Sequence, residues 1–267
     1  MFRRRTPEEE AEREARIARD VLLGIAPGMR TGRRVMNRLP ADPRCKLCAS
    51  PFRGPLAPVL GLIGKKPFPG NPKYCGFCFT EMIKRRAGAE VESSYLFADV
   101  RGSTTLAEQM SPSAFREAMD RFFATATQVL MEHEAFVDKY VGDEVMAFFI
   151  PAFTDEQHAQ RAIEAGQALL AAVAASETPL PVGAGLNSGV AFIGTVGSED
   201  KVEFTAMGDP VNVGARLASA AGEGELLVSM ATVQSAGLDA AGLEHRSLEL
   251  KGKTGPTEVV VLHASAE

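Results

Sequence analysis

The sequence predicts an α+β protein in which a larger domain, with helices packed on an antiparallel-rich sheet, follows a small module held together by cysteines. From about residue 92 onward, short apolar runs alternate with longer amphipathic runs, a pattern typical of helices packed on a sheet. All four cysteines precede residue 80, in two Cys-x-x-Cys pairs. A chain of 267 residues with 45% hydrophobic content is long enough for one large core and a smaller module.

Composition and charge limit the classes of partner. The formal net charge of −5 gives no general electrostatic reason to bind nucleic acid or an anionic membrane, although local basic patches remain compatible with it. Charged residues interrupt the most apolar stretch, 159–175, well short of the roughly 20 residues that a bilayer-spanning helix needs. The basic start MFRRRTPEEE lacks the apolar stretch of a secretory signal. These features predict a cytoplasmic protein with no membrane span and no nucleic-acid partner.

The chain divides into four segments. Residues 1–39 form a predicted helical segment, because acidic residues come early in 7–25 and an apolar face follows. This helix suits either a partner or dimer contact or a solvated spacer. Residues 40–80 form the cysteine module, 81–91 a linker helix, and 92–267 the larger domain.

Cys45, Cys48, Cys75 and Cys78 form two knuckles that can place four thiolates around one ion. The Pro- and Gly-rich span between them needs such a staple to become ordered. Structural zinc is the leading interpretation. An iron–sulfur cluster or a redox-active dithiol remains open, since the spacing alone does not separate zinc from iron. Two disulfides would require an oxidising compartment.

The elements of the larger domain follow from apolar periodicity and turn residues. The pattern predicts strands at 95–100, 135–141, 144–150, 182–187 and 190–196, with further strands near 248 and at 259–262. It predicts helices at 111–132, 155–176 and 209–221.

Two aspartates stand where a strand ends or turns. Asp99 closes the first predicted strand, and Asp143 lies at a hairpin tip, so neighbouring strands would bring both carboxylates to one sheet edge. Each alone is also compatible with an ordinary turn aspartate. Together they suit Mg²⁺ or Mn²⁺, which prefer oxygen ligands and leave positions for substrate phosphates. The pair therefore predicts phosphoryl or nucleotidyl chemistry.

The segment MGDPVNVGARL supplies the next candidates. Asn212 and Arg216 lie four apart on one face of a predicted helix, where a guanidinium matches a phosphate and an amide can orient a ribose. Downstream, Lys251 and Lys253 lie on a Gly-rich loop of a kind that holds polyphosphates but is also common as a solvated turn.

The segments FADVRGSTTLAE, KYVGDEVMAFF, LNSGVAFIGTVG, MGDPVNVGARL and LKGKTG occur in the order and spacing of class III nucleotidyl cyclases. The chain resembles this adenylyl and guanylyl cyclase catalytic domain over roughly residues 92–262. The resemblance implies a ferredoxin-like βαββαβ core that works as a dimer. It also implies that the nucleotide lies at the interface and that its 3′-hydroxyl attacks the α-phosphate.

The same resemblance implies a role for each candidate residue. Asp99 and Asp143 match the ligands of two Mg²⁺ or Mn²⁺ ions, with the backbone carbonyl of Val100 as a further ligand. Asn212 and Arg216 match the transition-state pair. Lys251 matches the triphosphate lysine, with Lys253 as a nearby substitute. Because one chain carries the whole set, the expected assembly is a homodimer with two interfacial sites, each taking the aspartates from one protomer and the remaining residues from the other.

Two further positions concern the base. Lys139 matches the residue that meets the purine edge, where a lysine donor suits adenine N1. Thr205 falls where mammalian-type adenylyl cyclases carry aspartate, a departure that predicts less strict discrimination. The expected activity is conversion of ATP to 3′,5′-cyclic AMP and pyrophosphate.

Alternatives stay open at this stage. They are a guanylate or dual-specificity cyclase, a catalytically silent nucleotide-sensing domain, and a nucleic-acid-binding role for the cysteine module. The basic residues Lys65, Lys66, Lys84, Arg85 and Arg86 support the last of these, and the acidic total opposes it. A diguanylate-type cyclase would need a GG(D/E)EF-like hairpin, which YVGDEVMAF lacks. The cysteine module is either a rigid staple or a sensor of metal or redox state.

Overall fold

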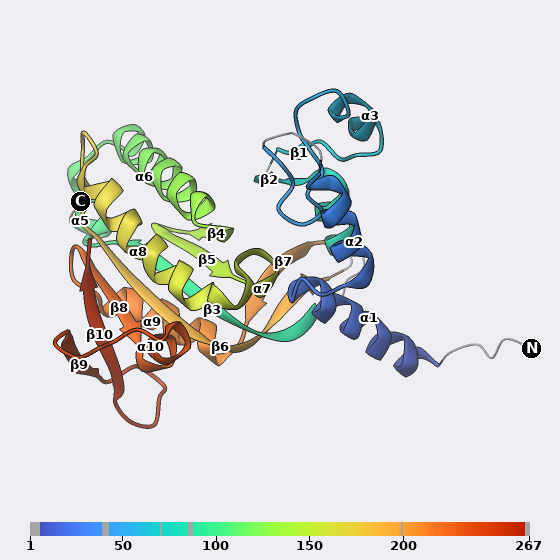
Figure 1. Ribbon diagram of the computed structural model, residues 1–267. Coiled ribbons are helices and arrows are strands. Elements are labelled where there is room, and N and C mark those ends of the chain that lie inside the picture. Colours follow the sequence, from blue (N-terminus) through green and yellow to red (C-terminus); the bar gives the residue numbers. More distant parts are fainter. Residues whose placement is uncertain (1–5, 39–42, 70, 85–87, 199, 265–267) are drawn as a thin grey trace, which may run out of the picture. The chain divides into compact units, whose positions relative to one another are not determined.

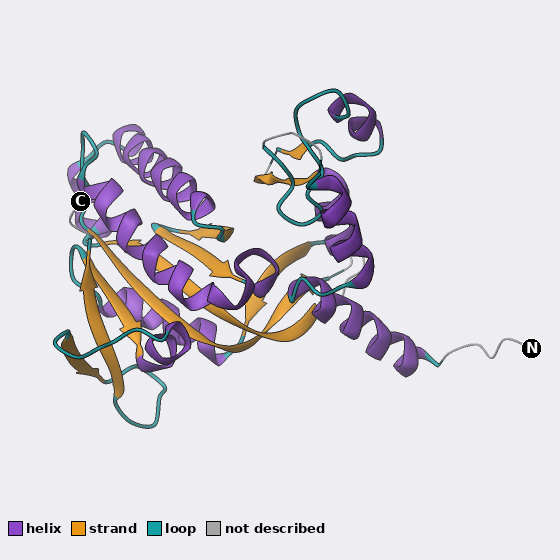
Figure 2. Cartoon of the chain, viewed as in Figure 1, coloured by secondary structure: helices purple, strands orange, loops and turns teal. Residues whose placement is uncertain are grey.

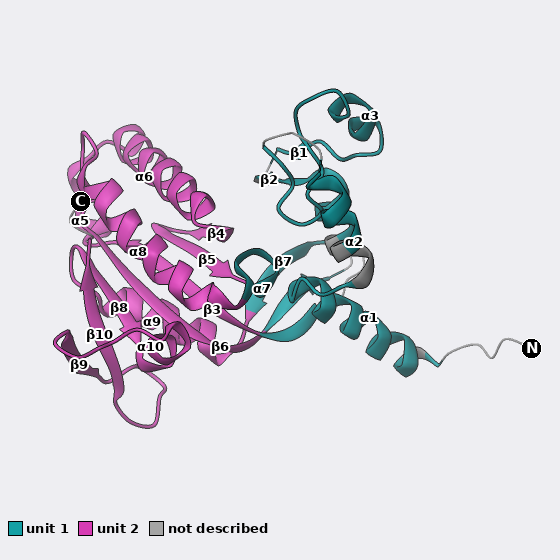
Figure 3. Ribbon diagram, viewed as in Figure 1, with its two compact units in different colours: residues 1–91, 151–155, 192–206 teal, residues 92–150, 156–191, 207–267 magenta. Residues whose placement is uncertain are grey.

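The computed structural model describes residues 6–38, 43–69, 71–84, 88–198 and 200–264. The chain forms two compact units (Figure 3). The first unit comprises Met1–Val91, Pro151–Asp155 and Phe192–Ala206, and the second comprises Glu92–Ile150, Glu156–Ala191 and Met207–Glu267. Two long strands, β3 (Gly88–Val100) and β6 (Val182–Gly197), contribute residues to both units.

The first unit begins with two helices, α1 (Pro7–Leu22) and α2 (Pro27–Met36). Helix α1 starts at a capping box, in which the Thr6 N–H donates to Glu9 Oε2 at 2.8 Å and the Glu9 N–H donates to Thr6 Oγ1 at 3.2 Å. This reciprocal pair satisfies two backbone donors that the helix itself leaves free. The structure therefore has a helix within 7–25, as the acidic start predicts.

The cysteine module of the first unit has little regular structure. It contains α3 (Ala57–Leu62), the two-stranded antiparallel sheet of β1 (Pro67–Phe68) and β2 (Asn71–Cys75), and α4 (Gly76–Lys84). Phe68 and Phe79 stack with their ring centroids 4.1 Å apart. Within the segment predicted as a linker helix, α4 ends at Lys84, residues 85–87 lie outside the described residues, and β3 has begun by Gly88. The predicted domain boundaries remain predictions.

The large sheet has the strand order β4-β5-β3-β6-β8-β10-β9, and β7 pairs with β6. The strand pairs β3–β5, β4–β5, β8–β10 and β9–β10 are antiparallel, whereas β6 and β8 are parallel. This confirms the predicted α+β class with an antiparallel-rich sheet. The remaining strands are β4 (Phe136–Val141), β5 (Glu144–Phe149), β7 (Val202–Met207), β8 (Glu225–Ser229), β9 (Glu244–Leu248) and β10 (Thr257–His263).

Alternation along the strands divides the core of the second unit between two faces of the sheet. On β8, Leu226 and Val228 belong to the large core with α6 (Pro112–Glu132), α8 (His158–Ala174) and α10 (Met230–Ala236), whereas Leu227 packs in the core of α9 (Asp209–Ala220). Successive side chains of a strand point to opposite faces, so α9 covers the face opposite α6 and α8. Figure 2 shows α6 and α8 side by side over the strands. The short helices α5 (Ser103–Gln109) and α7 (Pro151–Thr154) complete the fold (Figure 1).

Two predicted elements differ from the structure. The strands predicted at 182–187 and 190–196 form one continuous strand, β6, in which the turn-forming Asn187 donates from Nδ2 to the Pro210 carbonyl oxygen at 2.8 Å. The helix predicted from 155 begins instead at His158, because Asp155 adopts a positive φ of 53° and opens a 3₁₀ turn. Strands β7 and β8 and helices α5 and α10 were not predicted.

The described residues include no helix that is both long and apolar enough to cross a bilayer.

Close backbone packing fixes α9 on the sheet. A Cβ at Gly185 of β6 would lie 2.1 Å from the Ala218 nitrogen and 2.6 Å from the Gly214 oxygen of α9. Real Cβ atoms do not approach backbone so closely, so only glycine allows this contact. This close contact therefore fixes the distance between β6 and α9, the helix that carries Asn212 and Arg216.

Gly185→Ala is expected to lower the free energy of unfolding of the second unit by about 1–3 kcal/mol or more, because the added methyl group overpacks a rigid contact. Thermal unfolding followed by circular dichroism measures the effect. The matched control is Gly61→Ala on α3, where a Cβ meets nothing within 4 Å. A Gly185→Ala protein that melts at the wild-type temperature would contradict the packing described.

Candidate active site and metal centre

The two predicted metal-binding aspartates lie together at one edge of the sheet. Strands β3 and β5 are antiparallel neighbours, with Asp99 opposite Glu144. The Val100 N–H points to the Asp143 carbonyl oxygen at 3.4 Å, so the hairpin tip between β4 and β5 lies beside the end of β3. Gly142, with φ 65°, makes this tight turn. The structure thus brings together Asp99, Val100 and Asp143, whose role as metal ligands stays a prediction.

Three carboxyl groups crowd this edge. Burial, with a contribution from contact with Asp143, raises the pKa of Asp99 to about 6. Burial and the nearby charges of Asp99 and Asp143 raise the pKa of Glu144 to about 7. For Asp143, burial acts upward, but hydrogen bonds with Ser103 and Asp99 outweigh it and lower its pKa. The raised pKa values of Asp99 and Glu144 mean that a cation at this edge would favour their ionised forms, and an all-oxygen donor set suits Mg²⁺ or Mn²⁺.

Arg101 partly neutralises the cluster. Its guanidinium forms an ion pair with Asp99 Oδ2, and its Nη1 donates to the Ser219 carbonyl oxygen at 2.8 Å. The same side chain therefore links the aspartate edge to the C-terminal end of α9. Sequence reasoning did not single out Arg101, Ser103 or Glu144. Each lies within a motif quoted above, but no local signal identifies a partner 118 residues away, as Ser219 is from Arg101.

Helix α9 presents the predicted transition-state pair on its outer side. Val213 and Leu217 are buried beneath the helix, whereas Asn212 is exposed and Arg216 half-buried. The Arg216 guanidinium lies next to the lysine loop, since a Cβ at Gly252 would be 3.5 Å from its Nη2.

In that loop Lys253, rather than Lys251, contacts the helix. Lys253 Nζ lies 2.5 Å from Asp209 Oδ2, and the Lys251 side chain is exposed. The structure thus gathers Arg216 and the loop of both lysines into a second, basic cluster at α9.

The two predicted base-recognition residues lie in different units. Lys139 is half-buried on β4 opposite Met146, at a register shift between β4 and β5. Thr205 is buried on β7, in the first unit. Their roles stay predictions.

The four cysteines form a tight cluster in the first unit. Their sulfur atoms all lie within 4.8 Å of one another, and the Sγ atoms of Cys48 and Cys75 are 3.8 Å apart. Backbone N–H groups point at two of them, from Cys75 to Cys45 Sγ at 3.3 Å and from Cys78 to Cys75 Sγ at 3.4 Å. All four thiols are free of disulfides.

The arrangement fits one tetrahedral ion. Four sulfurs bound at about 2.3 Å in a tetrahedron are spaced about 3.8 Å apart. Contact with Cys45 and then with the other thiols lowers the pKa of Cys48, whereas the same contacts raise the pKa of Cys75 and of Cys78 far above the ordinary range. Four adjacent thiolates repel one another, so full ionisation requires a cation at the centre.

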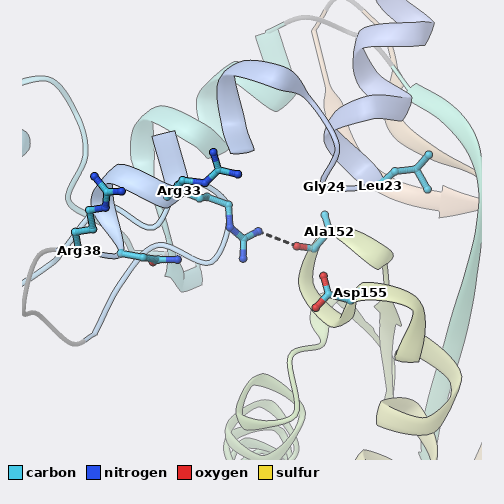
Figure 4. Close-up of a pocket in the computed structure, with 8 residues that line it drawn as sticks. Leu23, Gly24, Arg33, Arg38, Ala152 and Asp155 are labelled. Carbon is cyan, nitrogen blue, oxygen red and sulfur yellow. Dashed lines mark hydrogen bonds between the residues drawn. The ribbon is translucent and has the colours of Figure 1, made fainter. Parts of the chain in front are cut away.

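A separate basic cavity of 670 Å³ lies in the first unit (Figure 4). Arg33, on α2, donates from Nη1 to the Ala152 carbonyl oxygen at 3.1 Å. None of the predicted site residues lines this cavity. Its lining comprises Leu23, Gly24, Arg33, Arg34, Asn37, Arg38, Ala152 and Asp155, with three guanidinium groups and one carboxylate.

Known proteins are similar to this chain in sequence and in fold. The chain is 34% identical over 146 residues to an adenylate cyclase of Anabaena cylindrica and 30% identical over 140 residues to adenylate cyclase 1 of Rhizobium meliloti. These alignments cover 51% and 49% of this chain. They cover only 29% and 21% of the relatives, so the chain spans less than a third of their length.

Solved structures agree in fold. The guanylyl cyclase Cya2 superposes with a TM-score of 0.60 at 24% identity, over 65% of this chain and 92% of that one. The adenylyl cyclase CyaB from P. aeruginosa superposes with a TM-score of 0.58 at 24% identity, over 67% and 97% of the two chains.

The fold is that of the nucleotidyl cyclase structures just named. Residues 88–264 match the adenylate and guanylate cyclase catalytic domain, and the chain belongs to that family.

Proposed function

We propose that the protein is an adenylate cyclase that converts ATP to 3′,5′-cyclic AMP and pyrophosphate. The observation that carries the proposal is the meeting of Asp99 and Asp143 at one sheet edge within a cyclase domain. The adenylate cyclases of Anabaena cylindrica and Rhizobium meliloti, named above, support the choice of purine.

Each residue has a defined task in the proposed reaction. Asp99, Asp143 and the Val100 carbonyl would hold two Mg²⁺ or Mn²⁺ ions, and such ions would supply Lewis-acid activation of a hydroxyl and charge stabilisation of a leaving pyrophosphate. Arg216 stabilises charge on the transferring phosphate, and Asn212 orients the ribose.

The lysine loop binds the triphosphate beside these residues. Lys251 is exposed and available for the γ-phosphate, while Lys253 is paired with Asp209. We assign the triphosphate to Lys251 on this ground.

We further propose that two copies of the chain build each site. The aspartate edge lies at the end of β3 and the β4–β5 turn, whereas Arg216 and the lysine loop lie at the outer side of α9. In a symmetric dimer, the edge of one protomer faces the α9 cluster of its partner, so that two equivalent sites form. Lys139 and Thr205 join the α9 side of the site.

The test is incubation of the purified protein with ATP, and separately with GTP, in Mg²⁺ or Mn²⁺. Chromatography scores the cyclic product. Cyclic AMP formation that stops when EDTA is added is the expected result. Preferential formation of cyclic GMP would reassign the substrate, and no cyclic product from either nucleotide would overturn the proposed activity.

Lys139→Glu is expected to lower the kcat/KM ratio of ATP over GTP by about tenfold or more. A glutamate accepts hydrogen bonds from guanine N1 and its amino group, whereas the lysine donates to adenine N1. Competition between the two nucleotides in one reaction measures the ratio. The control is Lys201→Glu on an exposed loop, which should leave the ratio unchanged. An unaltered ratio in Lys139→Glu would remove this residue from base recognition.

For the cysteine module we propose structural zinc. The sulfur spacing favours a mononuclear site, since thiolates that bind different irons of a cluster lie farther apart than ligands of one ion. The four free thiols and a nucleotide substrate together support a cytoplasmic location.

A further inference from the structure

The cysteine module differs sharply in charge from the rest of the chain. Within the cysteine module of residues 40–80, Asp42 is the one acidic residue in the sequence, and the stretch 43–80 contains none, whereas the whole chain carries a formal charge of −5. The residues outside 43–80 therefore sum to −11. The six basic residues of the module are Arg44, Lys46, Arg53, Lys65, Lys66 and Lys73.

The same module exposes large apolar side chains. Helix α3 buries none of its residues, and Figure 1 shows it projecting from the rest of the first unit. We call the exposed set the α3 patch. Its members and their exposed fractions are Leu56 at 43%, Val59 at 61%, Leu62 at 88%, Ile63 at 59% and Phe77 at 48%.

The α3 patch is one continuous surface. Leu56, Val59 and Leu62 recur every third residue, which places them along one side of α3. Phe77 abuts the C-terminal end of the helix, because its N–H donates to the Gly64 carbonyl oxygen at 2.9 Å. The ammonium group of Lys65 lies 5.9 Å from the centre of the Phe77 ring. Positive charge thus borders the apolar surface directly.

We propose that the α3 patch docks the protein on an anionic membrane surface. Leucine, valine, isoleucine and phenylalanine side chains enter the boundary between headgroups and acyl chains, while Lys65, which borders the patch, and the adjacent Lys66 bind the anionic lipids. The segment 43–80, with six basic and no acidic side chains in 38 residues, is opposite in charge to an anionic membrane surface. Nucleic acid fits less well, since it offers no counterpart for a leucine that is 88% exposed.

Rigidity of the module supports the same proposal. The four cysteine sulfurs of the module lie within 4.8 Å of one another, and Cys45 and Cys75 are fully buried. A stapled loop presents its apolar side chains without an ordering cost at the moment of binding. The two signals, apolar insertion and basic residues, are the combination that stable membrane attachment requires.

The experiment is co-sedimentation of the full-length, metal-loaded protein with vesicles. One set contains phosphatidylcholine alone, and the other contains equal parts phosphatidylcholine and phosphatidylglycerol. We expect sedimentation with the anionic vesicles only, weakened by salt. Leu62→Gln/Ile63→Gln should reduce binding about tenfold or more at any salt concentration, and Lys65→Gln/Lys66→Gln should reduce it about tenfold at low salt only.

Matched variants separate the patch from general effects. Arg116→Gln/Arg161→Gln removes two exposed positive charges from the second unit, and Val190→Gln removes an apolar side chain that is 56% exposed there. Both should bind like wild type. All the α3 substitutions replace exposed side chains, so thermal melting should confirm that the fold is intact.

Four outcomes would overturn the proposal. Sedimentation with neither vesicle type, or equally with both, excludes an anionic membrane as the partner. Tight binding of duplex DNA that persists in Leu62→Gln/Ile63→Gln, without vesicle binding, assigns the surface to nucleic acid. A drop in molar mass by light scattering in that variant, again without vesicle binding, assigns it to a second copy of the chain.

Discussion

An Asp99→Ala chain and an Arg216→Ala chain should each lose cyclase activity by about two orders of magnitude or more alone, and should regain it when mixed. Removing a metal-binding carboxylate or a charge-stabilising guanidinium withdraws an interaction that acts mainly in the transition state. In a mixed dimer, one site combines both substitutions, while the other takes intact aspartates from one protomer and intact Arg216 from its partner.

The expected size of the rescue follows from counting. Random association makes half of the dimers mixed, and each mixed dimer has one complete site of two, so activity should return to about a quarter of the wild-type value. Refolding or subunit exchange of equimolar chains, followed by measurement of cyclic product, tests this.

The chain offers a sharp control for that rescue. Asp99 and Asp143 lie on the same edge, so a mixture of Asp99→Ala and Asp143→Ala chains should stay inactive, because no site in the mixed dimer has both aspartates. Rescue in this control, or none in the Asp99 and Arg216 mixture, would contradict the interfacial arrangement. Circular dichroism should first show that every single variant is folded.

The aspartate edge was accessible to sequence reasoning because its signals are local. Apolar runs on both sides of Gly142-Asp143 predict a hairpin, and the structure has β4 and β5 there, joined by a glycine at φ 65°. The end of β3 was found in the same way. The pairing of β3 with β5, which brings the two aspartates together, was an assumption at the level of the sequence. The structure has this pairing, with Asp99 opposite Glu144.

Features that depend on contacts between residues far apart in the chain could not be predicted from the sequence. Asn187-Ser188-Gly189 has the composition of a turn, which explains the prediction of two strands in place of β6. In the fold, the Asn187 amide binds a carbonyl at the start of α9, and Ser188 Oγ lies 2.6 Å from Ser94 Oγ in the core. These contacts remove the local preference for a turn. Arg101 was missed for the same reason, because its partner on α9 is remote in sequence.

Cys75→Ser is expected to abolish metal binding and to unfold the cysteine module while the cyclase core persists. Tetrahedral thiolate sites contribute about 10–16 kcal/mol of apparent free energy to folding in small zinc modules. This module has few other interactions that could keep it folded, since α3 buries none of its residues and β1 has only two residues. The second unit has its own large core of buried residues and does not depend on the thiolates.

Metal content and limited proteolysis measure the two parts of this prediction. Wild-type protein should carry one zinc per chain and be colourless, whereas an iron–sulfur cluster would absorb visible light. Cys75→Ser should lose the metal and become cleavable within residues 43–80. Ser50→Ala is the control, because it removes only the hydroxyl that lies 3.1 Å from Cys48 Sγ and leaves all four thiolates. If Cys75→Ser keeps its metal and its resistance to protease, the ion does not hold the module together.

The cyclase rate of the same Cys75→Ser protein distinguishes a staple from a sensor. The thiolates lie in the first unit, whereas Asp99, Asp143, Asn212 and Arg216 all belong to the second. A rigid staple leaves the rate per folded catalytic unit unchanged when its metal is lost. A sensor changes that rate, because β3 runs from the first unit to Asp99 and can carry a displacement to the aspartate edge. Chelation of the wild-type protein, with Mg²⁺ restored before the assay, should reproduce whichever result the substitution gives.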